Sequence, residues 1–477
     1  MGLTRRSLLI GGTAAVGAFA VPRALGLPPP PPLPETATQR GTTKWRVNDT
    51  APAAALSGYA QDSIRPGEPL RVRVSAANNW RGTVYRIGDY EGRGGLEIAS
   101  TRGNAQQHDF TVDPSTRAVS AAWPVAAELT TDDWPEGLYV LMLRSKAGES
   151  SIPFVVRSAS ADGRTAIVAS SLTWQAYNIW GGASLYKNMA GDFGGRSLSV
   201  SYDRPYDHSL WGRPISYSYD VPVARFVDEL DLDLAWFTNA DISRDPTLLS
   251  GARTVVSTGH DEYWTQAYRD ALVNARDAGS DLAFLGANVG YWHVTLNGNE
   301  VRCPKDSGID AKNIRWRDLG TPESSIVGMQ YDAFPVSGPM VVREPDFVLF
   351  EGIKGVRTGA SYPGLVGIEA DRFYPDSHTP RDIEVPTLSP VTCRGVPTWS
   401  TMTYYSTPSD AKVWAVGTMN WTRGLTGPNA DKGITKRSSE FVRLTTANFL
   451  AKSAAGTLPA AQRDVPDLPG HNTSGAA

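Results

Sequence analysis

The stretch ARTVVSTGHDEYWTQAYRDALVNARDAGSDLAFLGAN, residues Ala252–Asn288, decides the fold class of this chain. Its first and last parts, ARTVVSTG and SDLAFLGAN, are short apolar runs typical of buried strands. The part between them, TQAYRDALVNARDAG, has helical periodicity, with Thr265 as its predicted N-cap and Gly279 as its predicted end. A strand, a helix and a second strand in this order predict two parallel strands with a helix packed on their sheet.

The same alternation continues on both sides of this unit. Upstream, RTAIVASS and LDLAWFTN predict strands, and VPVARFVDEL predicts a helix with Pro222 near its start. Downstream, AKVWAVGTMNW predicts a strand and SSEFVRLTTANFL predicts a final helix. We therefore predict an α/β domain over residues 159–452, built on a parallel sheet with helices on both faces.

The chain before this domain is predicted to be all-β. PLRVRVSA alternates the apolar Leu70, Val72 and Val74 with polar residues, which is the period of a half-buried strand. GLYVLMLRS and SSIPFVVRS predict two more strands, joined by the hairpin KAGE. Short strands with frequent turns predict an Ig-like β-sandwich over residues 45–158.

The two ends of the chain lie outside these domains. Residues 1–20 carry the adjacent Arg5 and Arg6, an apolar stretch and an Ala-Phe-Ala cleavage signal, which predict a twin-arginine signal peptide. An ordinary Sec signal and a membrane anchor are the alternatives, but the apolar stretch is short for a spanning helix. Residues 21–44 predict a Pro-rich linker, and residues 453–477 predict a flexible tail. We expect an exported protein of the cell envelope or the extracellular space.

Composition excludes some functions. The 477 residues have 41% hydrophobic side chains and a formal net charge of -3, which argues against a nucleic-acid-binding protein.

Cys303 and Cys393 are the two cysteines; they form one disulfide or remain two free thiols. Without a CxxC motif, a cysteine-rich zinc site is excluded. The sequence also has no G-x-S-x-G, no GxxxxGK[ST] and no H-E-x-x-H motif. We expect a small-molecule ligand, no nucleic acid and no transmembrane segment.

Unusual side chains follow three of the predicted strands, in TWQAYNIWGG, HDEYW and ANVGYWHV. The carboxyl ends of parallel strands meet at one edge of a sheet, so these segments predict one pocket. His260 and Glu262 are two residues apart, and in extended backbone both would point into that pocket. Alternatively, Asp261 or Glu262 serves the helix N-terminus and His260 is a hydrogen-bonded turn residue. Tyr177 likewise belongs either to the pocket or to the core.

Five motifs together resemble the large (beta) subunit family of N,N-dimethylformamidase: WPEGLYVLMLRS, TWQAYNIWGG, GHDEYWT, FLGANVGYW and GTMNWTRGL. The resemblance covers most of the chain after the linker. It implies that the α/β domain is glutamine-amidotransferase-like without the cysteine of that fold. It also implies one iron ion held by two tyrosinates and a glutamate, a histidine that acts as general acid/base, and a small companion subunit.

On this resemblance, Tyr139, Tyr177 and Glu262 match the metal ligands and His260 matches the catalytic histidine. Glu369 in GLVGIEAD is the candidate for a further acidic catalytic residue. The alternative for Tyr139 is a tyrosine of the sandwich core. Three hard anionic oxygen donors suit a mononuclear, ferric iron.

The resulting expectation is an exported, metal-dependent hydrolase that cleaves an amide or a related C–N bond. A non-catalytic envelope protein that binds a carbohydrate or another small molecule is the alternative. A third possibility keeps the metal but catalyses another reaction, such as an oxidation. The aromatic, Gly-rich residues 181–219, which include Arg196, Arg204 and His208, are expected to shape the pocket. A homo-oligomer and a complex with a small subunit both stay open.

Overall fold

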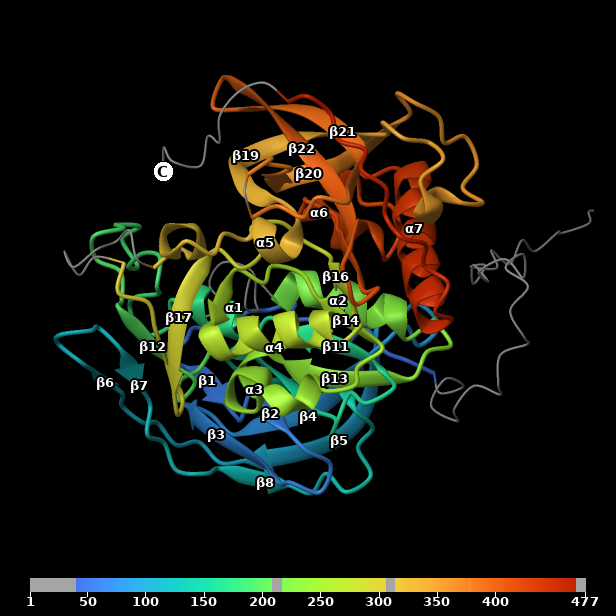
Figure 1. Ribbon diagram of the computed structural model, residues 1–477. Coiled ribbons are helices and arrows are strands. Elements are labelled where there is room, and N and C mark those ends of the chain that lie inside the picture. Colours follow the sequence, from blue (N-terminus) through green and yellow to red (C-terminus); the bar gives the residue numbers. More distant parts are fainter. Residues whose placement is uncertain (1–39, 208–216, 306–313, 377, 469–477) are drawn as a thin grey trace, which may run out of the picture.

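The computed structural model describes residues 40–207, 217–305, 314–376 and 378–468 (Figure 1). The predicted signal peptide, most of the predicted linker and His208 lie outside these ranges. Among the described residues, no helix has the length and apolar character that a membrane span requires.

The first part of the chain forms two β-sheets around a common core. One sheet has the order β2-β10-β9-β4-β5 and the other the order β1-β3-β8. Their bounds are β1 Leu56–Tyr59, β2 Ser63–Ile64, β3 Leu70–Ala76, β4 Trp80–Ile87, β5 Gly95–Gly103, β8 Ala127–Leu129, β9 Gly137–Ser145 and β10 Gly148–Val156. Val72 of β3 and Leu141 of β9 belong to one buried cluster that both sheets share. The all-β prediction for this region is therefore confirmed in its coarse form.

The second part is built on a seven-stranded sheet with the order β13-β11-β14-β16-β23-β22-β21. The strands are β11 Thr165–Ala169, β13 Leu234–Thr238, β14 Thr254–Ser257, β16 Asp281–Phe284, β21 Ile383–Cys393, β22 Val396–Ser406 and β23 Lys412–Ala415. The first five strands in this order are parallel, but β22 and β21 are antiparallel to their neighbours. The predicted parallel sheet is therefore a mixed one. The reason is a hairpin, whose turn holds Arg394 and Gly395 at positive φ and leaves no room for a crossover helix.

Helices cover both faces of this sheet, as predicted. Their bounds are α1 Ser171–Tyr177, α2 Tyr217–Val227, α3 Asn239–Arg244, α4 Gln266–Asp277, α5 Ser324–Val327, α6 Asn420–Gly424 and α7 Lys436–Ala454. Two neighbouring residues of β11 show this arrangement. Ile167 belongs to the hydrophobic cluster that includes α2 and α7, whereas Val168 belongs to the cluster that includes α3 and α4. Thr265 caps α4 by accepting a hydrogen bond from the backbone of Tyr268. Pro222 lies inside α2, not near its start.

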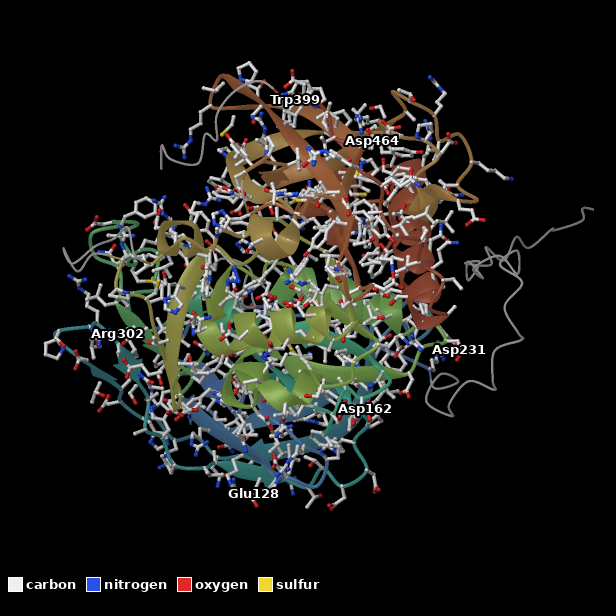
Figure 2. All side chains as sticks on the ribbon, in the orientation of Figure 1. Glu128, Asp162, Asp231, Arg302, Trp399 and Asp464 are labelled. Atoms are coloured by element: carbon white, nitrogen blue, oxygen red, sulfur yellow. The ribbon has the colours of Figure 1, made fainter. Side chains whose placement is uncertain are left out.

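Three smaller sheets complete the architecture of the described residues. The sheet β12-β18-β17-β15 contains β12 Ser199–Ser201, β15 Tyr263–Thr265, β17 Trp292–Asn297 and β18 Glu300–Arg302. The pair β6 Thr111–Val112 and β7 Val119–Ser120 lies near it, and the long pair β19 Gln330–Val341 and β20 Ser361–Arg372 lies on the other side of α5 (Figure 1). Side chains fill the space between these layers (Figure 2). The candidate site lies where the α/β sheet meets β20.

The chain after α7 is not the flexible tail that its composition predicts, as far as the structure describes it. Asp464 exchanges backbone hydrogen bonds with Ile383 and Val385 of β21, and its carboxylate pairs with Arg343. β21 is an edge strand, and its unpaired backbone groups provide partners for this segment. Residues 469–477 lie outside the described ranges.

The two cysteines are free and buried. Cys303 contacts the carbonyl oxygen of His293, and Cys393 that of Phe334. Of the two alternatives that composition left open, the structure shows free thiols.

Candidate active site

The candidate site lies at the carboxyl ends of β11, β14 and β16, where the sequence predicted a pocket. Tyr177 is the last residue of α1, which follows β11. His260 and Glu262 lie in the loop after β14, and Asn288 lies in the loop after β16. Gly259 allows the turn before His260, because its φ is +59° and a Cβ there would come within 2.7 Å of Tyr219.

Tyr177, His260 and Glu262 form the centre of the site. The Tyr177 hydroxyl donates to Oε2 of Glu262 at 2.9 Å and lies 3.0 Å from Nε2 of His260. His260 Nε2 is 3.2 Å from the same carboxylate oxygen, and Nδ1 lies 3.3 Å from the carbonyl of Ala287. His260 and Glu262 thus point the same way, as their spacing predicted.

The helix-terminus alternative does not describe these residues. Helix α4 begins only at Gln266, and its first turn contains no acidic residue. The Asp261 carboxylate points away from the site and accepts hydrogen bonds from Ser257, Asn239 and Tyr268. Asp261 therefore holds the loop in place, while the Glu262 carboxylate faces Tyr177 and His260.

Tyr186 is the functional candidate that sequence reasoning missed. Its hydroxyl donates to Oε1 of Glu262, the oxygen that Tyr177 leaves free. Its ring stacks on that of Tyr177, with centroids 4.5 Å apart. Tyr186 lies within residues 181–219, which were expected to shape the pocket, but no spacing marks it among the other aromatic residues there.

Tyr139 is not brought to the site. It lies on β9 in the core between the two N-terminal sheets, and its hydroxyl donates to the carbonyl of Pro135 at 2.6 Å. Its ring stacks on Trp134. Strand alternation explains this position, because Tyr139 shares the inner face of β9 with Leu141 and Leu143. The structure therefore favours the core alternative for Tyr139.

Glu369 reaches the site from β20. Among the described residues, Oε2 of Glu369 and Oδ1 of Asn288 are buried polar atoms without a hydrogen-bond partner. Burial raises the pKa of Glu369 to about 7; His260 acts against this shift and Glu262 adds to it. Unpartnered polar atoms are costly inside a protein, so they mark a place where a ligand can bind.

The charges of the site depend on one another. Burial lowers the pKa of His260, but the carboxylates of Glu369 and Glu262 more than offset this and raise it to about 9. Burial acts to raise the pKa of Glu262, but the hydrogen bond and charge of His260 leave it below its usual value. The pKa values of Tyr177 and Tyr186 are raised well above 10 by burial and by Glu262. Both phenols therefore hold their protons unless a cation lies beside them.

A buried lysine provides positive charge behind the site. Lys305 Nζ donates to the hydroxyl of Tyr263 at 2.7 Å. It lies 4.0 Å from the ring centroids of both Tyr186 and Trp292. An ammonium group enclosed by aromatic rings is stabilised by cation–π interactions. The charge of Lys305 also helps to keep Glu262 ionised and so lowers its pKa.

Arg204 connects the two segments that carry Tyr177 and Tyr186. Its guanidinium is fully buried and donates to four backbone carbonyls, those of Gln175, Asn178, Trp180 and Ala183. Burial lowers its pKa to about 9. The first two carbonyls lie at the end of α1 and the last two lie in the following loop, so Arg204 fixes the position of one tyrosine relative to the other.

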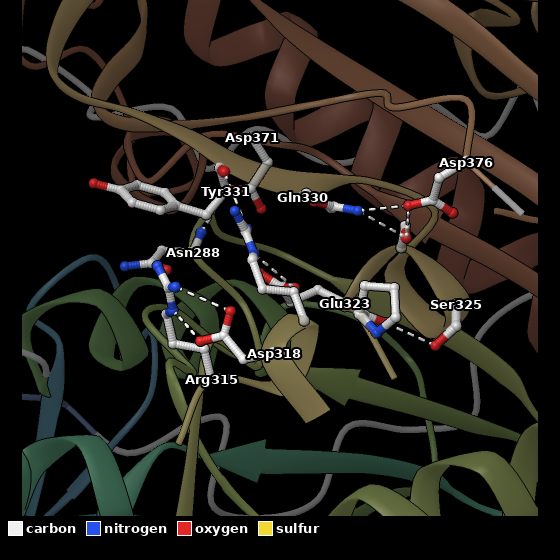
Figure 3. A network of polar contacts seen from close by, with 12 residues as sticks. Asn288, Arg315, Asp318, Glu323, Ser325, Gln330, Tyr331, Asp371 and Asp376 are labelled. Atoms are coloured by element: carbon white, nitrogen blue, oxygen red, sulfur yellow. Dashed lines mark hydrogen bonds and ion pairs between the residues drawn. The ribbon is translucent and has the colours of Figure 1, made fainter. Parts of the chain in front are cut away.

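A second network holds the loop after β16 against β20 (Figure 3). The backbone N–H of Asn288 donates to Asp371 at 2.7 Å, while Asn288 itself has φ of +57°. Arg317 and Glu323 form an ion pair at 2.5 Å close by. Because Asp371 is two residues from Glu369, this network sets the position of Glu369 relative to Asn288.

The residue types of the site bear on what it can bind. The described part of the chain contains no group of three or more His, Cys, Asp and Glu side chains arranged to hold a metal ion. The donors that do converge are two phenols and one carboxylate, which are hard oxygen ligands. Such a set fits a highly charged cation and leaves His260 and Glu369 outside the ligand set.

In a comparison with known families, residues 81–434 match a family model described as "N,N-dimethylformamidase beta subunit-like, C-terminal". The matched range includes every residue of the candidate site. No curated protein matches the chain significantly.

Proposed function

Since this chain belongs to the N,N-dimethylformamidase beta subunit-like family, we propose that it is a metal-dependent hydrolase that cleaves an amide or a related C–N bond. One observation carries the proposal. The hydroxyls of Tyr177 and Tyr186 each meet one oxygen of the Glu262 carboxylate, with Nε2 of His260 at 3.2 Å.

Tyr177, Tyr186 and Glu262 would hold a mononuclear, ferric iron. Tyr186 takes the place that the resemblance assigned to Tyr139, whose hydroxyl is occupied by a backbone carbonyl. The donors fit such an ion because they are oxygen ligands that become anionic beside a strong positive charge. Glu369, whose Oε2 has no hydrogen-bond partner among the described residues, is close enough to His260 and Glu262 for their charges to influence one another.

When bound, the iron would polarise the carbonyl of the substrate and acidify water. The protein groups would then move protons. Glu369, with a pKa of about 7, would accept a proton from the attacking water. His260 would hold a proton on Nε2 and deliver it to the nitrogen that leaves as an amine. Asn288 would orient the substrate through its buried amide.

The proposal is tested by iron content and amine release together. The native chain, purified with iron, should release amine from N,N-dimethylformamide or another small amide in a panel. Glu262→Gln should lose iron and activity, whereas Glu440→Gln, on the exposed face of α7, should keep both. Iron without amine release would favour another reaction such as an oxidation. The absence of both in the native chain would favour the non-catalytic ligand-binding alternative.

Further proposals rest on the sequence and the family. We propose that Arg5 and Arg6 direct export by the twin-arginine route to the cell envelope or extracellular space. Fractionation of cells that express an Arg5→Lys, Arg6→Lys variant tests this.

We also propose an Ig-like sandwich for the two N-terminal sheets and a glutamine-amidotransferase-like fold for the α/β domain. A small amide is the proposed substrate, and size-exclusion chromatography with light scattering tests for a homo-oligomer or a small companion subunit.

A further inference from the structure

A cavity separate from the candidate active site lies at the junction of the N-terminal sheets and the α/β domain. Its volume is about 280 Å³, and none of the residues of the candidate active site lines it. Its walls come from β1, β3, α3 and the loop after β12, elements that lie in the lower part of Figure 1. Junctions between domains are a common place for small-molecule sites, and this volume is near the lower end of their range.

Arg73 leaves its hydrogen-bonding capacity unused in this cavity. Within the described ranges, its guanidinium makes no hydrogen bond and no ion pair, although it lies 5.6 Å from the ring centroid of Tyr59. The nearby Arg71, in contrast, pairs with Glu128 at 3.3 Å. A guanidinium has five N–H donors in a planar arrangement that matches a carboxylate. Stacking on Tyr59 orients these donors in advance.

Asp62 provides acceptors in the wall of the same cavity. Its side chain is only 10% exposed, and its two side-chain contacts are long: 3.4 Å to Oγ of Ser171 and 3.7 Å to Arg244. A buried carboxylate is usually held by shorter bonds. Burial raises its pKa to about 6, which is consistent with this weak compensation. Asp62 can therefore accept a hydrogen bond from a hydroxyl group of a ligand.

We propose that this cavity binds a small hydroxylated monocarboxylate, such as a sugar acid, with its carboxylate on Arg73 and a hydroxyl on Asp62. Among the described residues, Arg71 pairs with Glu128 and Arg244 contacts Asp62, whereas Arg73 has no ion pair. Asp203, the other carboxylate of the wall, accepts hydrogen bonds from Asn299 at 3.1 and 3.3 Å. One unpaired guanidinium beside two carboxylates favours a ligand with a single negative charge. A doubly charged phosphate would lie near Asp62 and be repelled by it. This site is independent of the proposed hydrolase activity.

The test is titration calorimetry on the full chain, with D-glucuronate as the probe and D-glucose as the neutral probe with the same ring. Glucuronate should bind at least tenfold more tightly than glucose. Arg73→Gln should weaken glucuronate binding at least tenfold, because one charge-assisted bidentate contact is lost. Arg81→Gln, which removes an exposed arginine of β4 outside the cavity, should leave binding unchanged. Thermal melting checks that both variants are folded.

Asp62→Asn separates the two halves of the site. It should weaken glucuronate binding and leave the binding of butanoate, which has no hydroxyl, unchanged. The proposal is overturned if glucuronate gives no heat up to about 10 mM, a limit that corresponds to very weak affinity. It is equally overturned if glucose binds as tightly as glucuronate, or if Arg73→Gln keeps native affinity.

Discussion

Tyrosines are buried in two regions of the molecule. One is the core between the N-terminal sheets, and the other is the candidate site at the carboxyl ends of the α/β strands, which we call the crest and which holds Tyr177, Tyr186, His260 and Glu262. The hydroxyls of the tyrosines have different kinds of hydrogen-bond acceptor in the two regions. Tyr139 gives its hydroxyl to the backbone carbonyl of Pro135, a neutral acceptor within the same region. Tyr177 and Tyr186 give theirs to one carboxylate, beside a histidine. The first arrangement is complete without a ligand. The second gathers acidic groups that a cation can stabilise, and this difference separates a structural tyrosine from a candidate ligand.

Among the substitutions considered, Glu262→Ala should have the largest effect on iron binding and on activity. Removing the acceptor shared by two tyrosines should lower bound iron to near zero and activity by more than about 10³-fold, as expected when a metal ligand is lost. Metal analysis and amine release measure the two effects. Full iron content in Glu262→Ala would show that the crest does not hold the ion through Glu262.

His260→Gln should separate proton transfer from metal binding. Its side chain lies beside the ligands without replacing one of them, so iron should stay bound while kcat falls by about 10²- to 10⁴-fold, the usual range for a general acid/base. Stopped assays of amine release on an iron-matched sample give the ratio. A variant with native kcat would remove His260 from the chemistry.

Tyr186→Phe and Tyr139→Phe form a matched pair that tests the comparison itself. Tyr186→Phe should weaken iron binding by about tenfold or more, whereas Tyr139→Phe should keep native iron content. Tyr139→Phe should instead lower the free energy of unfolding by about 1 kcal/mol, because one buried hydrogen bond is lost. Denaturant titration and iron analysis of both variants decide this. The reverse outcome would return Tyr139 to the ligand set.

A smaller effect, on the pH dependence of the free energy of unfolding, is expected from the carboxyl group of Asp220, which lies next to the crest. Burial raises its pKa to about 7, although Thr258 and Trp174 hydrogen-bond to its carboxylate. An acid with a raised pKa stabilises the fold fully below its unfolded value and loses that contribution as pH rises through its folded value. Unfolding free energy should thus fall by about 3 kcal/mol between pH 4 and 7. Asp220→Asn should flatten this part of the profile, and an unchanged profile would count against the shift.

The sequence predicts much of the fold because its signals are local. The alternation in β3, the apolar run of β14 and the cap of α4 at Thr265 depend on neighbouring residues only. The antiparallel strands β21 and β22 and the docking of Asp464 depend on which sheet edge is free, and no local pattern encodes that.

The same distinction explains the candidate site. His260 and Glu262 could be placed together because a spacing of two residues fixes their direction. Tyr186 could not be found this way, since its contact with Glu262 spans 76 residues and depends on how Arg204 holds the intervening loop. Tyr139 was assigned through the short match Gly-Leu-Tyr, a pattern that suits an inner-face strand residue equally well.

The visible absorption spectrum of the iron-loaded protein tests the central claim most directly. If the two tyrosines of the crest hold the ion, the native protein and Tyr139→Phe should share a tyrosinate-to-iron charge-transfer band. That band should weaken and shift in Tyr177→Phe and in Tyr186→Phe. A native, iron-replete protein without such a band, or a band that only Tyr139→Phe removes, would contradict the account.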